Sequence, residues 1–108
     1  MQKRMNNTNK IKELSIVAQR VMPPNGEAYL FGSRARGEAR SDSDWDVLVL
    51  LDKEHITLED YSLYGYPFME LGWDIDAIII PIMYTKRDWE RSNFTPFYKN
   101  VMHDRIRL

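Results

Sequence analysis

Two short apolar runs joined by a glycine-punctuated loop constrain the fold of this chain more than any other feature. The first run is Glu27 to Phe31, and its length and the glycine that follows it favour a buried strand over a helix. The second run, Asp44 to Leu51, begins with acidic residues and continues as an apolar, valine-containing segment typical of a strand. The sequence therefore predicts two strands connected by the small and charged residues of Gly32 to Ser43.

Helical periodicity is present on both sides of these strands. Apolar residues recur at helical spacing near the N-terminus and predict one amphipathic helix from about residue 9 to residue 21, carried by Ile11, Leu14, Val17, Ala18 and Val21. A second helical pattern begins at Thr57, a suitable capping residue, and extends to Leu71. Because proline removes a backbone donor and clashes with the preceding turn, Pro67 predicts a kink or a break near Tyr66.

A third strand is predicted over Trp73 to Met83, which follows Gly72, is rich in isoleucine and is closed by Pro81. The tail from Thr85 to Leu108 carries two short helical patches around Pro96. It ends in basic residues that we expect at a solvated helix end, namely Arg105 and Arg107.

Length and composition exclude several classes of protein. A chain of 108 residues without internal repeats predicts a single domain over 1–108. The absence of cysteine excludes disulfides, thiolate metal sites and cysteine nucleophiles, and we expect a cytoplasmic protein. The longest apolar run, Ala77 to Met83, is far shorter than the roughly 20 residues of a membrane helix. The formal net charge of −1 provides no overall basic surface, so direct binding of nucleic acid is not expected.

The loop after the first predicted strand is suited to binding phosphate. Gly32 allows the backbone to come close to a ligand, while the Ser33 hydroxyl and the turn amides can donate to phosphate oxygens. A helix beginning here would add its positive end. Arg34 and Arg36 are either solvated loop charges or phosphate contacts, and we include both as candidate nucleotide ligands.

Paired aspartates begin the second predicted strand. Because residues two apart on a strand face the same side, Asp44 and Asp46 present two carboxylates to one point, while Trp45 turns to the opposite face. Oxygen ligands suit magnesium, and two metals roughly 4 Å apart can stabilise an in-line phosphoryl displacement. Asp76 on the predicted third strand is the candidate third acid, with Asp74 on the same face as the competitor.

Gly32-Ser33, a spacer of ten residues and Asp44-Trp45-Asp46 resemble the DNA polymerase beta nucleotidyltransferase superfamily. Within it, Gly32-Ser33-Arg34-Ala35-Arg36-Gly37 is similar to the minimal nucleotidyltransferases, which are often paired with a HEPN-domain partner in toxin–antitoxin modules. The segment Thr95 to Val101 is similar to the C-terminal helix of that family. The resemblance therefore covers most of the chain.

This resemblance implies a polymerase-beta-like α/β (α+β) fold, with a small mixed sheet of at least three strands flanked by helices. It also implies ATP as the substrate and a two-metal Mg²⁺ site. Gly32 and Ser33 would contact the phosphates, and Asp44 and Asp46, with Asp76, would hold the metal and act in catalysis. The reaction would move AMP to an acceptor hydroxyl, a tyrosine of the HEPN-type partner, and release pyrophosphate.

One departure from the family leaves other readings open. Members that are similar around Leu71-Gly72-Trp73 carry their third acid nearer the position of Ile78, which is apolar here. A non-catalytic, antitoxin-like module with the same fold is therefore an alternative, as is adenylylation of a small hydroxyl compound such as an aminoglycoside. The aromatic residues of the second helical region are interpreted as a partner surface, and they are Tyr61, Tyr64, Tyr66, Phe68 and Trp73.

Overall fold

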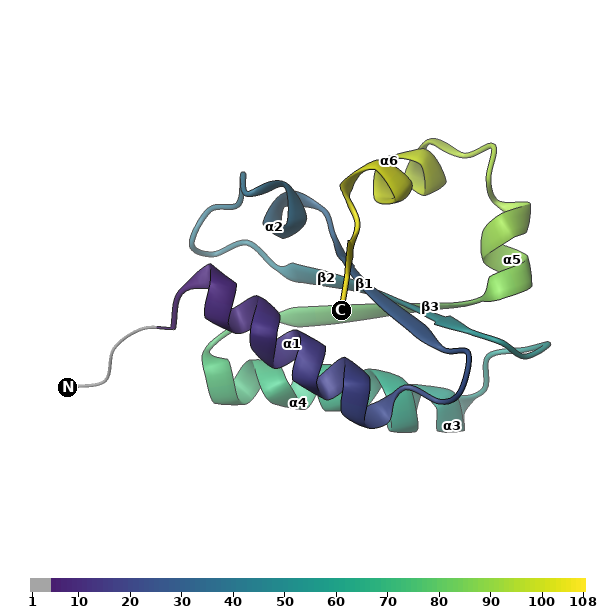
Figure 1. Cartoon of the computed structure of the whole chain (residues 1–108), viewed down its shortest axis with the longest axis horizontal. Helices are drawn as coiled ribbons and strands as arrows, with labels where there is room; N and C mark the ends of the chain where they lie inside the picture. The colour runs from purple at the N-terminus through teal and green to yellow at the C-terminus, as the bar shows by residue number, and fades with distance from the viewer. Residues whose placement is uncertain (1–4) are drawn as a thin grey trace.

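The computed structural model, which describes residues 5–108, is a four-stranded sheet with helices on both faces (Figure 1). Along the chain the elements are α1 (Asn7–Val21), β1 (Glu27–Phe31), α2 (Ser33–Arg36), β2 (Trp45–Leu51), α3 (Leu58–Asp60), the π-helix η1 (Tyr61–Gly65), α4 (Tyr66–Ile75), β3 (Ile79–Thr85), α5 (Lys86–Arg91), α6 (Pro96–Asp104) and β4 (Ile106–Arg107). None of the helices within this part of the chain is long and apolar enough to cross a membrane.

The sheet is mixed, as the family resemblance implies. Its strand order is β3-β2-β1-β4, with β1 antiparallel to both β2 and β4 and with β2 parallel to β3. In Figure 1, α1 and α4 lie along one side of the sheet, and α2, α5 and α6 lie on the other. The parallel pair follows from the chain itself, because the helical segment between β2 and β3 is long enough to return the chain to the same end of the sheet.

Alternation along β2 divides the core between the two faces of the sheet. Val47 and Val49 are completely buried against the side covered by α1 and α4. Leu48 and Leu50 face the opposite side, where they pack with Trp89 of α5. Full burial of such a side chain contributes about 1.5–3 kcal/mol, so β2 is fixed in register by both layers.

The first helix and the first two strands are confirmed within two residues of the predicted bounds. At the second helical region the capping role of Thr57 is also confirmed: its side chain accepts from the Asp60 amide, and the Asp60 side chain accepts from the Thr57 amide. The predicted kink takes the form of the π-helix η1, and Pro67 then occupies the first turn of α4, where its missing N–H costs nothing.

The third strand is shorter than predicted, and the sequence reading of its first half is wrong. Residues 73–75 continue α4, whose buried positions Phe68, Leu71 and Ile75 follow helical spacing. The helix ends at Asp76, which has φ +54, and the Ala77 amide donates to the Gly72 carbonyl (2.9 Å). β3 begins only at Ile79, because the apolar residues before it are needed on the buried side of the helix.

The C-terminal tail is also different from the prediction. Ile106 and Arg107 pair with β1 as the short edge strand β4, instead of ending a solvated helix. The guanidinium carbons of Arg105 and Arg107 lie 4.7 and 5.5 Å from the ring centroid of Tyr29. Cation–π contact and strand pairing therefore fix both arginines, and they close the side of the sheet opposite β3.

Candidate functional site

The turn after β1 brings the backbone directly against the second of the paired aspartates. Gly32 has φ +77 and ψ −159, a conformation that is essentially restricted to glycine. A Cβ at this position would lie 2.7 Å from Oδ2 of Asp46. The reason is the register, in which Phe31 lies opposite Asp46. The two parts of the predicted site therefore meet at one point, as the sequence spacing indicates.

The two aspartates differ in their surroundings. Asp44 is exposed and immediately precedes β2, whereas Asp46 is the second residue of β2 and is half-buried. Trp45 between them is buried on the opposite face, which agrees with the predicted alternation. Burial, and then the charge of Asp44, raises the pKa of Asp46 above its ordinary value. A half-buried carboxylate beside a second one is suited to bind a cation, because a cation offsets both the burial of the charge of Asp46 and the nearby charge of Asp44.

The predicted third acid is not on the strand beside them. Asp74 lies in the last turn of α4, and Asp76 caps that helix. In the parallel register Asp46 is paired with Ile80 of β3, and the Trp45 amide donates to the Ile78 carbonyl (2.8 Å). The positions next to the paired aspartates on this face are therefore apolar. The placement of Asp76 on the third strand is wrong, because helix α4 continues past the start of the predicted strand, and the metal role of Asp76 stays a prediction without strand geometry to support it.

The residues present fit one magnesium ion bound together with a nucleotide. In the described part of the chain, no group of three His, Cys, Asp or Glu side chains could hold a metal ion by itself. Magnesium bound with nucleotides, however, is held by one or two carboxylates together with phosphate oxygens. Asp44 and Asp46 are the residues that would hold it. Among residues 5–108, no third acidic side chain joins this pair to hold the predicted second metal.

Arg34 supports the loop that carries Asp44. Its side chain is buried, and its guanidinium donates to the carbonyl oxygens of Ser41 (3.2 Å) and Ser43 (2.8 and 3.2 Å). The same group lies 4.6 Å from the ring centroid of Trp45. These contacts leave the predicted phosphate contact of Arg34 without support in the structure. They assign the side chain to positioning of the loop.

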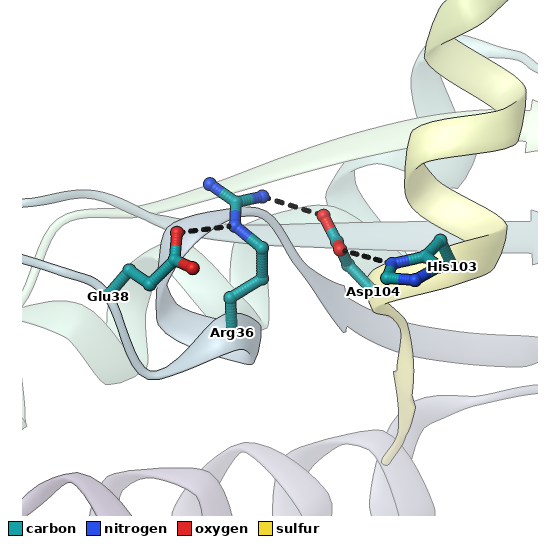
Figure 2. A network of polar contacts seen from close by, with 4 residues as sticks. All are labelled: Arg36, Glu38, His103 and Asp104. Atoms are coloured by element: carbon teal, nitrogen blue, oxygen red, sulfur yellow. Dashed lines mark hydrogen bonds and ion pairs between the residues drawn. The ribbon is translucent and has the colours of Figure 1, made fainter.

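Arg36 is held in a network at the end of α6, which Figure 2 shows with its four residues. Its guanidinium donates to Glu38 (3.0 Å) and to Asp104 (2.6 Å), and Asp104 also contacts His103 (3.2 Å). Hydrogen bonds from His103 and Arg36 hold the pKa of Asp104 below its ordinary value. Arg36 could bind a phosphate only by exchanging these partners, so its predicted role is not the one seen in this conformation.

Sequence reasoning missed Asp104 completely. This residue fastens α6 to the short helix that follows Gly32, and it is 68 positions from Arg36 in the chain. Nothing in the local sequence around Asp104 indicates such a contact. The side chain of Asp104 is only 8% exposed, although it lies in the last turn of a helix.

A cavity of about 560 Å³ opens between the loop that precedes Asp44 and the end of α4. Its walls come from the loop that carries Asp44 and from the end of α4, and they include Arg34, Ser41, Asp42, Ser43, Gly72, Trp73, Asp76, Ala77 and Ile78. Asp76 therefore lines the same cavity as Ser43, on the side formed by α4, whereas neither of the paired aspartates lines it.

With this geometry established, comparison with known proteins identifies the class. The nucleotidyltransferase domain family matches residues 11–107, and the chain therefore belongs to that family. The match includes the Gly32 turn and both aspartates. The predicted family is confirmed.

The chain is similar to "Protein adenylyltransferase MntA" from Aphanizomenon flos-aquae (strain 2012/KM1/D3), with 38% identity over 64 residues. That match covers 59% of this chain and 39% of the relative, so it spans about two-fifths of the length of that protein. A solved structure described as a toxin–antitoxin with AMP-PNP has a TM-score of 0.60 at 20% identity, covering 95% of this chain and 72% of that one. This likeness shows that the two share the nucleotidyltransferase fold.

Proposed function

We propose that this protein is a magnesium-dependent nucleotidyltransferase that moves AMP from ATP to a hydroxyl of a partner protein. The acceptor we propose is a tyrosine of a HEPN-type toxin. In this reaction a bond forms between the acceptor oxygen and the α-phosphorus, the bond to the bridging oxygen breaks, and pyrophosphate leaves. The hydroxyl proton passes to a base. The adenylyltransferase name of one relative and the toxin–antitoxin description of one solved structure support this proposal.

The observation that carries the proposal is the approach of the Gly32 turn to Asp46. A phosphate chain held at the amides of Gly32 and Ser33 lies beside the aspartate pair, so the same ligand can contact both. Magnesium, when bound, would supply neutralisation of the developing phosphate charge. Burial and the charge of Asp44 raise the pKa of Asp46, and a cation bound at the pair would counteract the effect of Asp44 on this pKa.

Titration calorimetry with a non-hydrolysable ATP analogue tests this proposal, with and without Mg²⁺. We expect metal-dependent binding by the wild type and loss of it in Asp44→Ala and Asp46→Ala. Asp52→Ala is the matched control, because Asp52 is an exposed aspartate just after the opposite end of β2. Transfer of label from ATP to the purified partner should follow the same order. Wild-type labelling by the Asp44→Ala/Asp46→Ala double variant would refute the site.

A second candidate function is favoured by one observation, the apolar face at Ile78 and Ile80 beside the aspartates. Without a third carboxylate, this chain could bind its partner and neutralise it by contact alone. The two functions separate in one experiment. Asp46→Ala should abolish partner neutralisation if transfer is required, and it should leave neutralisation intact if contact suffices.

A further inference from the structure

An apolar band lies on the outer side of η1 and α4, and we call it the α4 band. It consists of Tyr61, Tyr66, Met69 and Trp73, which are 45–69% exposed. Tyr66 and Trp73 are in edge-to-face contact, with ring centroids 5.9 Å apart. A hollow of about 420 Å³ lies along the band, lined by Tyr61, Ser62, Gly65, Tyr66, Met69 and Pro81. Soluble proteins rarely expose a contiguous surface of this kind unless it binds a partner.

The side chains of the α4 band are not part of the hydrophobic core. Helix α4 buries Phe68, Leu71 and Ile75 on its sheet side, so Met69 and Trp73 form a second apolar stripe on the same helix. One of these two apolar stripes is buried against the sheet, and the other is left exposed because no element within residues 5–108 covers it. The band is therefore an addition to the fold and not part of its core.

The Asp, Glu, Lys and Arg side chains of the segment that carries the band all have one sign. From Glu54 to Thr85 the chain has no Lys or Arg, while Glu59, Glu70, Asp74 and Asp76 are exposed acids. Glu70 lies four residues after Tyr66, and Asp74 four residues after Glu70, so both carboxylates lie along one side of the band. Among the described residues, none of these four acids takes part in an ion pair of the structure.

We propose that the α4 band is the docking surface for an amphipathic helix of a partner protein that carries large apolar side chains flanked by Lys or Arg. Charge complementarity selects this occupant. A second copy docked symmetrically on the same band would place carboxylates against carboxylates, which is unfavourable. Nucleic acids and anionic membranes are excluded by the same charge. Pairing at the edge of β3 is also weakened, because Pro81 in the middle of that strand has no N–H to donate.

The band also reaches the cavity between the loop 41–43 and the end of α4. Trp73 lies at one end of the band and lines that cavity. A helix docked along the band would therefore end at this cavity, whose wall includes Ser43, the residue that precedes Asp44 in the chain. This extends the proposed function by giving the acceptor protein a binding surface, although the surface itself does not depend on transfer activity.

Two synthetic peptides of equal length test the proposal, one an amphipathic helix of Leu and Lys and the other the same helix with Glu in place of Lys. The emission of Trp73 reports binding locally, because Trp45 and Trp89 are buried. We expect the Leu/Lys peptide to bind and to shift this emission to the blue, and the Leu/Glu peptide to bind at least about tenfold more weakly.

Variants of the full chain locate the binding. Met69→Lys should weaken binding of the Leu/Lys peptide at least about tenfold, measured by peptide fluorescence anisotropy. Ile16→Lys is the matched control, since Ile16 is 55% exposed on α1, a helix that contributes no residue to the band, and this variant should bind like the wild type. Equal binding of the two peptides, or equal losses in the two variants, would overturn the proposal.

Two further measurements separate the possible failures. A dimer in sedimentation velocity that Met69→Lys dissociates would overturn the proposal in favour of a second copy as the occupant. The nucleotide analogue should bind Met69→Lys as it binds the wild type. If Met69→Lys loses peptide binding but still binds the nucleotide analogue, the lost contact is at the docking surface alone. If the wild type does not bind the nucleotide analogue, the result contradicts the proposed function alone.

Discussion

Replacement of Gly32 by alanine separates backbone strain from damage to the site, because a second glycine provides the control. Gly32 has φ +77 and ψ −159, and alanine there costs about 1–3 kcal/mol. Gly37 has φ +73 and ψ 19, and alanine in this left-handed conformation costs about 1–2 kcal/mol. Both variants should therefore lose similar amounts of folding free energy, with decreases in Tm of at least about 4 °C per kcal/mol.

The two variants should differ at Asp46. A Cβ on Gly32 would lie 2.7 Å from its Oδ2, whereas a Cβ on Gly37 has no atom within 4 Å. Since the carboxylate ends a flexible side chain, it can rotate away at little cost in stability. That rotation moves the Asp46 carboxylate from the position where it would face a phosphate-bound cation. A displacement of 1 Å at a catalytic site can lower the reaction rate about a hundredfold.

Urea unfolding and titration calorimetry with the Mg²⁺–nucleotide analogue measure the two effects separately. We expect Gly37→Ala to retain wild-type nucleotide binding and Gly32→Ala to lose at least about tenfold in affinity, equivalent to about 1.4 kcal/mol. Equal affinities of the two variants would refute the argument, because the close approach of Gly32 to Asp46 would then have no part in nucleotide binding.

Three further predictions concern charge and loop position. The raised pKa of Asp46 means that its charged form is disfavoured in the folded state, so Asp46→Asn should be more stable than the wild type near pH 7. Urea unfolding should show that this gain in stability vanishes below the pKa of unfolded aspartate, about 3.9. Asp104 has a lowered pKa, so Asp104→Asn should be less stable near pH 7, and this difference should vanish in the same assay as the pH falls through the folded pKa of Asp104. Arg34→Met removes charge-assisted bonds to two carbonyls, so the free energy of unfolding should fall by about 2 kcal/mol or more, with faster amide exchange over 38–44.

The first half of the site could be predicted because its geometry is local. Strand alternation places Asp44 and Asp46 on one side and Trp45 on the other whatever the remaining topology is. The Gly32 turn follows β1 directly, and the antiparallel pairing of β1 with β2 brings it to Asp46. Two strong strand signals that are adjacent in the sequence leave few other arrangements.

The end of α4 and the edge strand β4 depend on tertiary contacts, which a local sequence pattern does not predict. The segment around Trp73 is compatible with both strand and helix, and packing of Leu71 and Ile75 against the sheet decides for the helix. Pairing of Ile106 with Leu30 likewise joins residues that are far apart in the sequence. Tertiary contacts override a short-range preference in both cases.

Ile80 marks the position at which a third carboxylate would lie beside Asp46, since the parallel register pairs these two residues. It is 39% exposed, so Ile80→Asp should fold with little loss of stability. Adding a charged oxygen ligand should raise the apparent Mg²⁺ affinity in the presence of the nucleotide analogue by roughly tenfold. Ile16→Asp, which adds the same charge on α1, controls for net charge and should have no effect. If both variants leave the magnesium dependence unchanged, the metal does not bind at the face shared by Asp46 and Ile80. A gain in Ile80→Asp alone would mean that this chain retains the metal site of its fold with one carboxylate missing.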